Sequence, residues 1–242
     1  MLAKMNIELQ GGSLHPNMAS LFHGYLMKEI EPSFAEYLHY NQTNPFTSCI
    51  VREKSGDKAH WRITTFNKRA YDRIIAPLAG RSSDSIYIEH KDMEFQIRNM
   101  KVEKSSFEEL YLNTKRTPRL RLLTPTSFKS DGRTHIFPDV KVLLNGVINK
   151  INLHSDSIRI EDEHALEELM KGMYLRDYNL RTAVFSMEKI KVKGFIGTLD
   201  VGLYGDPALL ELLNFILASA EYTGLGIKTS LGMGGVNIEY RN

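Results

Sequence analysis

The order of strand-like and helix-like segments, which repeats in the two halves of the chain, constrains the fold most. Strands are predicted by alternating apolar and polar residues, and helices by apolar residues three or four positions apart. In the first half the order is strand 4–10, helix 16–30 with a continuation at 34–38, strands 46–52 and 60–66, helix 68–79, and strands 84–90 and 94–101. Turn residues at 55–57 and 91–92 favour hairpins. This β-α-β-β-α-β order, with one extra strand, is typical of the ferredoxin-like fold.

The second half repeats this pattern. The expected elements are strand 120–123, helices 138–150 and 161–171, strands 180–190 and 193–203, helix 208–222 and strand 236–240. The joint between the halves is expected at 114–118. A length of 242 residues suffices for two domains. We therefore predict an α+β chain of two tandem ferredoxin-like (RRM-like) domains, residues 1–117 and 118–242.

Composition excludes several classes of protein. The formal net charge of +2 is too small to indicate a nucleic-acid partner by itself, although residues 118–159 hold seven lysines and arginines against three aspartates. The single cysteine, Cys49, rules out an internal disulfide and makes a structural zinc site improbable. No apolar run is long enough to span a membrane. We expect a cytoplasmic protein without a membrane partner.

The tail holds five glycines around one lysine, directly before the last predicted strand. Residues 224–235 read Gly-Leu-Gly-Ile-Lys-Thr-Ser-Leu-Gly-Met-Gly-Gly, and the lysine is Lys228. Glycine lets backbone N–H groups approach a ligand closely, and such amides beside a cation suit a phosphate. The alternative is a tight turn and bulge that binds nothing.

Two common phosphate-binding motifs do not fit this tail. A P-loop needs the lysine directly after a glycine, but Ile227 precedes Lys228. A dinucleotide-binding loop follows an early strand and opens a helix, whereas this loop follows a helix and precedes a strand. The remaining phosphate-bearing class of ligand is a polynucleotide backbone.

A tandem ferredoxin-like pair that ends in Gly-x-Gly-x5-Gly-x-Gly resembles the RAMP superfamily of CRISPR systems, and more closely its repeat-RNA processing endoribonuclease, the sixth Cas family. Two further segments carry the resemblance: 37–39 (Tyr-Leu-His) followed by 45–48 (Pro-Phe-Thr-Ser), and 123–128 (Leu-Thr-Pro-Thr-Ser-Phe). The three matches lie in the family's order and span nearly the whole chain. Singly, only the glycine-rich loop is specific.

The resemblance implies that the chain binds the repeat of a precursor CRISPR RNA and cuts it once per repeat, without a metal or other cofactor. The 2′-hydroxyl attacks the adjacent phosphate and leaves a 2′,3′-cyclic phosphate and a 5′-hydroxyl. Such a reaction needs a proton acceptor, a donor for the leaving oxygen and cations near the phosphate. A CRISPR effector complex as partner, and a homodimer, are both compatible with this interpretation.

The resemblance also assigns candidate catalytic residues. His39 lies in the loop where the family carries its catalytic histidine, and Tyr25 corresponds to a tyrosine that accompanies it in some members. Several members place a lysine shortly after the histidine, but residues 41–44 here are Asn-Gln-Thr-Asn. Lys28, Arg52 and Lys228 are the candidate replacements.

His23 is the rival to His39, because it lies two residues from Tyr25 on the first predicted helix. The alternative is a histidine packed on Leu26 and Met27 at the flank of that helix. The acidic run at 161–168 is better explained by a solvated helix face than by a metal site.

The RNA-binding residues predicted by this hypothesis are loop residues and members of the basic stretch. They are Gly224, Gly226, Lys228, Thr229, Ser230, Gly232 and Gly234 in the loop, and Arg119, Arg121, Lys129 and Arg133 in the stretch. Two other functions stay open. One is a non-catalytic RAMP-family RNA-binding protein or effector-complex subunit, favoured by the missing lysine. The other is a ferredoxin-like enzyme or sensor for a nucleotide-sized phosphate ligand.

Overall fold

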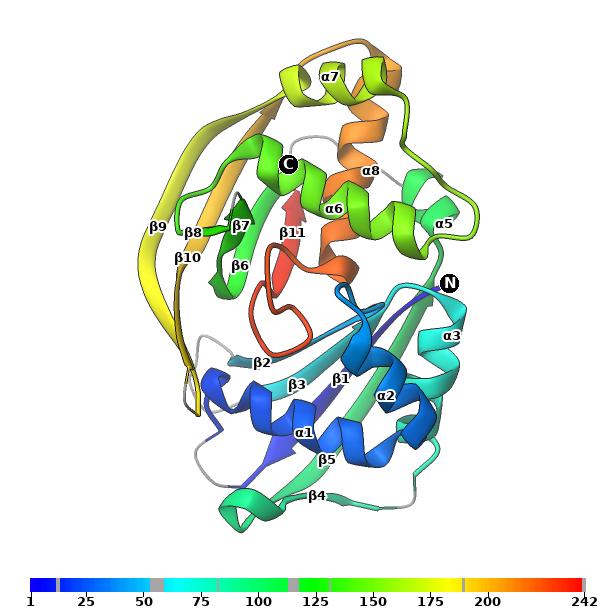
Figure 1. Ribbon diagram of the computed structural model, residues 1–242, viewed down its shortest axis with the longest axis vertical. Helices are drawn as coiled ribbons and strands as arrows, with labels where there is room; N and C mark the ends of the chain where they lie inside the picture. The colour runs from blue at the N-terminus through cyan, green and yellow to red at the C-terminus, as the bar shows by residue number, and fades with distance from the viewer. Residues whose placement is uncertain are drawn as a thin grey trace.

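The computed structural model of the chain describes residues 1–11, 14–52, 59–81, 83–112, 118–130, 132–188 and 190–240. The expected turn at 55–57 and residues 114–117 of the expected joint lie outside these ranges. Two antiparallel sheets dominate the structure, one above the other in Figure 1. We call the lower sheet with helices α1 to α4 the first lobe, and the upper sheet with helices α6 to α8 the second lobe.

The first lobe has a sheet in the order β2-β3-β1-β5-β4. Its strands are β1 (Leu2–Gln10), β2 (Phe46–Arg52), β3 (Ala59–Thr65), β4 (Ser85–Ile88) and β5 (Met93–Ser105). Its helical segments are η1 (Pro16–Met18), α1 (Ala19–Glu29), α2 (Pro32–Tyr40), α3 (Lys68–Ala70), the π-helical turn η2 (Tyr71–Ile75), α4 (Ala76–Ala79) and η3 (Glu89–Lys91). Every predicted strand and helix of this half is present.

The second lobe has a sheet in the order β11-β6-β10-β9. Its strands are β6 (Pro118–Thr126), β9 (Met173–Met187), β10 (Ile190–Leu203) and β11 (Val236–Tyr240), and its helices are α6 (Val140–His154), α7 (Glu163–Gly172) and α8 (Pro207–Thr223). In both lobes the first strand pairs with the third and with a strand from the end of the half, which is the ferredoxin-like order. The predicted tandem fold is confirmed.

Aspartate caps set where the helices of the second lobe begin. The side chains of Asp139, Asp162 and Asp206 accept hydrogen bonds from backbone amides three residues later. Such caps satisfy amides that have no partner inside the helix. The expected helix at 161–171 therefore starts two residues later, after Asp162.

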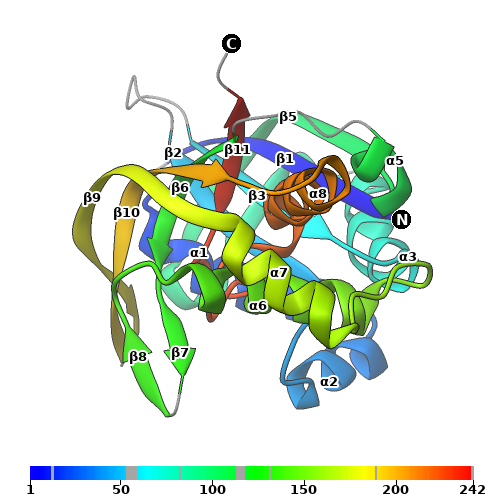
Figure 2. The same ribbon diagram turned by 90° about the horizontal axis from the view of Figure 1, so that it is seen from above.

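Three short elements were not predicted. They are helix α5 (Phe107–Leu112) and the hairpin of β7 (Phe128–Ser130) and β8 (Arg133–His135). The strands of this hairpin are three residues each, too short to show a period of two. Figure 2 shows the hairpin projecting from the side of the second lobe.

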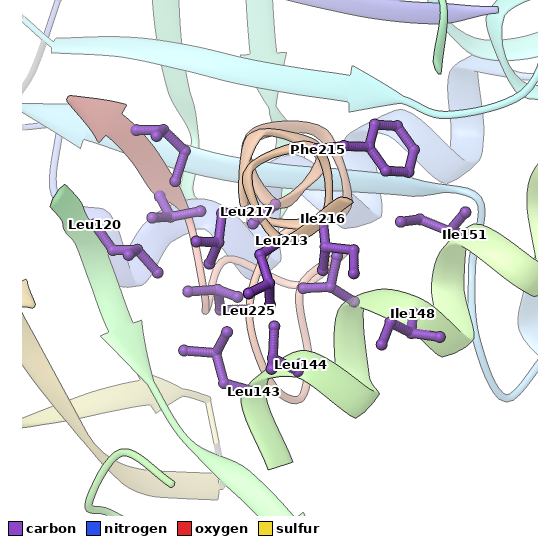
Figure 3. Close-up of a cluster of buried hydrophobic side chains, with 14 of the residues drawn as sticks. Leu120, Leu143, Leu144, Ile148, Ile151, Leu213, Phe215, Ile216, Leu217 and Leu225 are labelled. Carbon is purple, nitrogen blue, oxygen red and sulfur yellow. The ribbon is translucent and has the colours of Figure 1, made fainter. Parts of the chain in front are cut away.

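The core of the second lobe lies between α6, α8 and the sheet. Figure 3 shows Leu143, Leu144, Ile148 and Ile151 of α6 facing the side chains of α8, with Leu120 of β6 beside them. All five are buried. Burying an aliphatic side chain of this size contributes about 1.5–3 kcal/mol. This packing fixes α6 beside α8, which leads directly into the glycine-rich loop.

The two lobes share their hydrophobic cores. Phe185 and Met187, at the end of the long β9 strand, pack with the core of the first lobe, and so does Met233 of the glycine-rich loop. In return, Leu2 and Phe66 pack with the core of the second lobe. The lobes are joined by interdigitating side chains.

Polar contacts also join the lobes across the face of the first sheet that carries no α1. Lys4 of β1 pairs with Glu221 of α8 at 2.9 Å. Arg62 of β3 donates to Asn237 of β11 at 2.6 Å. In the described part of the chain, no helix has the length and apolar character needed to cross a membrane.

Candidate functional site

A pocket of about 470 Å3 lies between the first lobe and the tip of the glycine-rich loop. Its lining comes from His23 and Met27 of α1, from residues 35, 36 and 38–41 around the end of α2, from Asn44, and from Ser230 and Leu231 of the loop. The structure thus brings both candidate histidines, His23 and His39, to the same pocket as the loop. We call it the histidine pocket.

His39 lies exposed in the last turn of α2. The expectation that it lies in a loop was wrong, because α2 continues to Tyr40. Phe34 and Leu38 bury the inner face of this helix, which leaves the neighbouring His39 directed outward. Its ring meets that of Tyr40 edge-on at 5.5 Å.

His23 is more enclosed than His39. Its ring stacks on Phe46 with a centroid distance of 6.0 Å and an angle of 2° between the planes. Its Nδ1 atom is buried without a hydrogen-bond partner. Burial lowers the pKa of His23, while a hydrogen bond to the Ser230 backbone acts in the opposite direction. The side chain is therefore neutral at neutral pH and has an acceptor to offer.

Asn44 is a pocket residue that the sequence did not single out. Its Oδ1 atom is buried without a hydrogen-bond partner. A buried acceptor in this state is costly unless a ligand or water supplies a donor. Only its place in the segment after His39 could have drawn attention to it, and that segment was noted for lacking a lysine.

Tyr25 lies elsewhere, so its expected place beside His39 was wrong. Residues 23 and 25 project from different sides of a helix, because successive residues are about 100° apart. The Tyr25 hydroxyl accepts a hydrogen bond from Arg81 Nη1 at 2.6 Å and lines a different pocket. Lys28 lines that second pocket too, where it pairs with Glu89. Neither residue lines the histidine pocket.

The glycine-rich loop is held by hydrogen bonds from its amides, some within the loop and some to residues 124–127. The amides of Leu225, Ile227, Leu231, Met233 and Gly234 donate to backbone carbonyls, and that of Gly235 donates to the Thr124 hydroxyl. The Gly224 amide closes the last turn of α8. The expected amide cradle was therefore wrong for Gly224 and Gly234, whose N–H groups bind within the protein.

Two of these glycines are needed for close packing. A Cβ atom on Gly226 would lie 2.1 Å from the carbonyl oxygen of Ser127, and one on Gly234 would lie 2.0 Å from that of Leu225. Both residues have positive φ, +75° and +68°. These positions support the alternative that the glycines form a tight turn.

The backbone amides near the tip of the loop form fewer hydrogen bonds. In the described chain no hydrogen bond is found for the amides of Gly226, Lys228, Thr229, Ser230 or Gly232. Lys228 has a φ of +56° and forms no ion pair with any described residue. The carbonyl of the next residue, Thr229, accepts from the Ser48 amide of β2 at 3.0 Å, which ties the tip to the first lobe.

The basic stretch divides into two parts. Arg119 pairs with Asp200 at 2.6 Å, and Arg121 pairs with Glu239 at 3.2 Å. Both guanidinium groups already bind carboxylates in the chain without RNA, and their predicted contact with RNA phosphates stays a prediction. Lys129 and Arg133 lie exposed on the β7–β8 hairpin without a carboxylate partner in the described residues.

The acidic run does not gather into a metal site. Asp162 caps α7, and Glu168 pairs with Lys171 on the exposed side of that helix. Among the described residues, no three histidine, cysteine, aspartate or glutamate side chains group as metal ligands would.

Two ferredoxin-like lobes, with a histidine pocket beside a C-terminal glycine-rich loop, make up the described chain. The family model for the CRISPR-associated endoribonuclease Cas6 matches residues 120–236. A Streptococcus thermophilus CRISPR-associated endoribonuclease Cas6 is 26% identical over 231 residues, which cover 94% of each chain. Its Mycobacterium tuberculosis counterpart is 24% identical over 222 residues, 90% of this chain and 70% of the relative.

A solved Cas6 product complex shares the fold, with a TM-score of 0.83 and 22% sequence identity over 99% of this chain and 100% of that one. In sequence over most of its length, and in fold, the chain is similar to the Cas6 family of CRISPR-associated endoribonucleases.

Proposed function

We propose that this protein is a metal-independent endoribonuclease that cuts precursor CRISPR RNA within each repeat, with the scissile phosphate in the histidine pocket. One observation carries the proposal: His39, His23 and the tip of the glycine-rich loop line the same pocket. The product complex of a relative supports it as well. In this proposal the domain of residues 1–117 contributes the two histidines, and the domain of residues 118–242 contributes the glycine-rich loop.

The reaction needs a group that removes a proton from the 2′-hydroxyl of the nucleotide before the cut. His39 is exposed at the mouth of the pocket, where its imidazole can meet the RNA strand. The resulting oxygen attacks the adjacent phosphorus, and the bond from phosphorus to the 5′-oxygen breaks. That oxygen takes up a proton, and the products carry a 2′,3′-cyclic phosphate and a 5′-hydroxyl.

Three other groups support this chemistry in the proposal. Neutral His23 and the Asn44 carbonyl oxygen accept hydrogen bonds from other donors of the bound RNA, because the single proton of the attacking hydroxyl goes to His39. Lys228, which has no ion pair among the described residues, supplies positive charge toward the phosphate. Lys129 and Arg133 on the hairpin contact the RNA backbone at a distance from the pocket. The single cysteine, Cys49, is free, as expected for a protein that functions in the reducing cytoplasm.

The test uses purified protein and the repeat RNA of the CRISPR array nearest to its gene. In EDTA the wild type should cut the repeat once and leave a cyclic phosphate and a 5′-hydroxyl. A single 2′-deoxy substitution before the cut should block cleavage without loss of binding. His39→Ala should lower the single-turnover rate by about 100-fold or more and still bind the repeat.

His164→Ala is the matched control, because His164 is an exposed histidine of α7 that lines neither pocket described above. It should cleave at the wild-type rate. Binding of the repeat without cleavage would instead favour a non-catalytic RNA-binding protein. Competition by a mononucleotide, with little dependence on salt, would favour a sensor of a small phosphate ligand.

A further inference from the structure

Lys150 of α6 is a buried lysine that the proposed chemistry does not use. Only 8% of the residue is exposed, and it forms no ion pair with any described residue. Its Nζ atom donates to the carbonyl oxygens of Thr223 at 2.7 Å and Gly224 at 3.2 Å, and to the Thr229 hydroxyl at 3.4 Å. An ammonium group has three N–H bonds, and here each one has an acceptor.

The place of these acceptors stabilises the protonated form of the side chain without a carboxylate. Thr223 ends α8, and Gly224 follows it as the C-terminal cap. The last carbonyls of a helix lack partners and carry partial negative charge, so a cation at this end is stabilised. The third acceptor, Thr229, lies five residues further along the loop and next to Ser230 of the histidine pocket. Lys150 therefore ties the start of the loop to its tip.

His154 lies one helical turn after Lys150, and positions i and i+4 share a helix face. Its Nε2 atom lies 3.1 Å from the carbonyl oxygen of Thr43, and its ring meets that of Phe66 edge-on at 5.2 Å. Thr43 directly precedes Asn44, which lines the opposite wall of the histidine pocket. One face of α6 thus contacts two segments that flank the histidine pocket: the loop through Thr229, and the residue before Asn44 through Thr43.

We propose that Lys150 and His154 are positioning residues of the nuclease: Lys150 sets the loop wall and His154 the Asn44 wall of the histidine pocket. The inference rests on the proposed function. Neither side chain touches RNA, and each acts through the backbone segment that it holds. A displaced wall moves the scissile phosphate relative to His39, and small misplacements of reacting groups are costly in rate.

The first test separates positioning from RNA binding. Lys150→Met keeps the length of the side chain and removes its donors, and Thr229→Val removes the acceptor at the tip. Each should lower the single-turnover cleavage rate. Lys150→Met should lower it by about 10- to 100-fold, while its repeat-RNA affinity changes by less than about threefold. The double variant should be little slower than Lys150→Met alone, because both remove the same contact.

Two further variants complete the set. His154→Phe keeps a ring against Phe66 but removes Nε2, and it should slow cleavage without loss of affinity. Lys171→Met is the control, since it removes an exposed lysine that is paired only with Glu168 and should leave the rate unchanged. A folded Lys150→Met variant that cleaves at the wild-type rate would overturn the proposal, as would equal losses of rate and affinity.

A second measurement needs no cleavage. Hydrogen exchange of the RNA-free protein should show faster exchange in Lys150→Met at the Ser48 amide, which is bonded to Thr229, and at the loop amides. Helix α1 should keep its protection. If Lys150→Met does not fold, Thr229→Val provides the same comparison. Unchanged exchange in either variant would refute the role of Lys150. Absence of cleavage by the wild type would instead contradict the proposed function and leave the exchange result standing.

Discussion

Arg119 donates two hydrogen bonds to the carboxylate of Asp200, from Nε at 2.6 Å and from Nη2 at 2.9 Å. Asp200 is only 3% exposed. Hydrogen bonding to Asp200 raises the pKa of the arginine further. The pair links β6 to β10 in the middle of the second sheet, so the guanidinium group serves the fold.

Arg119 is bound to Asp200, whereas Lys228 forms no ion pair with any described residue, so substitutions at the two positions should have different effects. We expect Arg119→Ala to lower the melting temperature, because a buried carboxylate loses two hydrogen bonds from the guanidinium group. The substitution should change repeat-RNA affinity by about twofold or less. Lys228→Gln should leave the melting temperature unchanged but weaken RNA binding and reduce the slope of log K against log salt by about 1. Salt titrations of binding and thermal unfolding check both. An Arg119→Ala variant that folds as well as wild type and loses RNA would reverse the assignment.

Tyr25→Phe should cleave repeat RNA at a rate within about twofold of wild type. The hydroxyl is bonded to Arg81 in the second pocket, away from both histidines. The ring stays against Trp61, so folding is preserved. Single-turnover kinetics measure this rate, and a decrease of more than about tenfold would mean that the Tyr25 hydroxyl takes part in the reaction.

His23→Phe should slow cleavage by about 10- to 100-fold, less than His39→Ala does. Phenylalanine preserves the stack on Phe46 and removes the unpartnered Nδ1 atom. If His23→Phe abolishes cleavage while His39→Ala remains active, the two assignments must be exchanged.

Two glycine substitutions should have opposite effects on stability. Gly226→Ala forces a Cβ to within 2.1 Å of a carbonyl oxygen at positive φ, and we expect a loss of about 2 kcal/mol or more in the free energy of unfolding. Gly146→Ala lies within helix α6, where an added Cβ meets nothing within 4 Å. It should gain about 0.5–1 kcal/mol. Denaturant unfolding of both variants beside the wild type provides the comparison.

The dependence of stability on pH should carry a contribution from Lys150. Burial lowers the pKa of Lys150 from 10.5 to about 7. Between these two pH values the unfolded chain binds a proton that the folded chain does not, so the free energy of unfolding rises with pH. The slope reaches at most about 1.4 kcal/mol per pH unit.

The comparison that isolates this effect is the difference between wild type and Lys150→Met, measured by denaturant unfolding from pH 7 to pH 9. The stability of the wild type relative to the variant should increase with pH. A difference that stays constant, or that shrinks as pH rises, would mean that the lysine keeps an ordinary pKa in the folded state.

Local patterns were sufficient to predict the fold. Alternation in 4–10 and apolar spacing along 16–30 depend on neighbours in sequence, and both elements appear where expected. Helix α2 shows the limit of such reasoning, because its last turn carries His39 beyond the buried Leu38 and no sequence signal marked that extra turn. Short elements such as β7 and β8 offered too few residues for a pattern.

The candidate site depended on contacts between distant residues. Arg119 and Asp200 are 81 positions apart, so nothing local could show that the arginine was already bound. Lys150 and Thr229 are 79 positions apart, and the lysine looked like one more member of a basic stretch. The glycine pattern was recognised, but whether each amide turns toward a ligand or toward carbonyls such as those of Pro125 and Ser127 is decided by tertiary packing.

The insertion of Phe185 and Met187 into the opposite lobe limits how the molecule can move. A motion that separated the two lobes would expose both side chains to water, at a cost of about 1.5–3 kcal/mol for each. The relative position of the two lobes is therefore fixed, and on binding it is the RNA that must change its conformation.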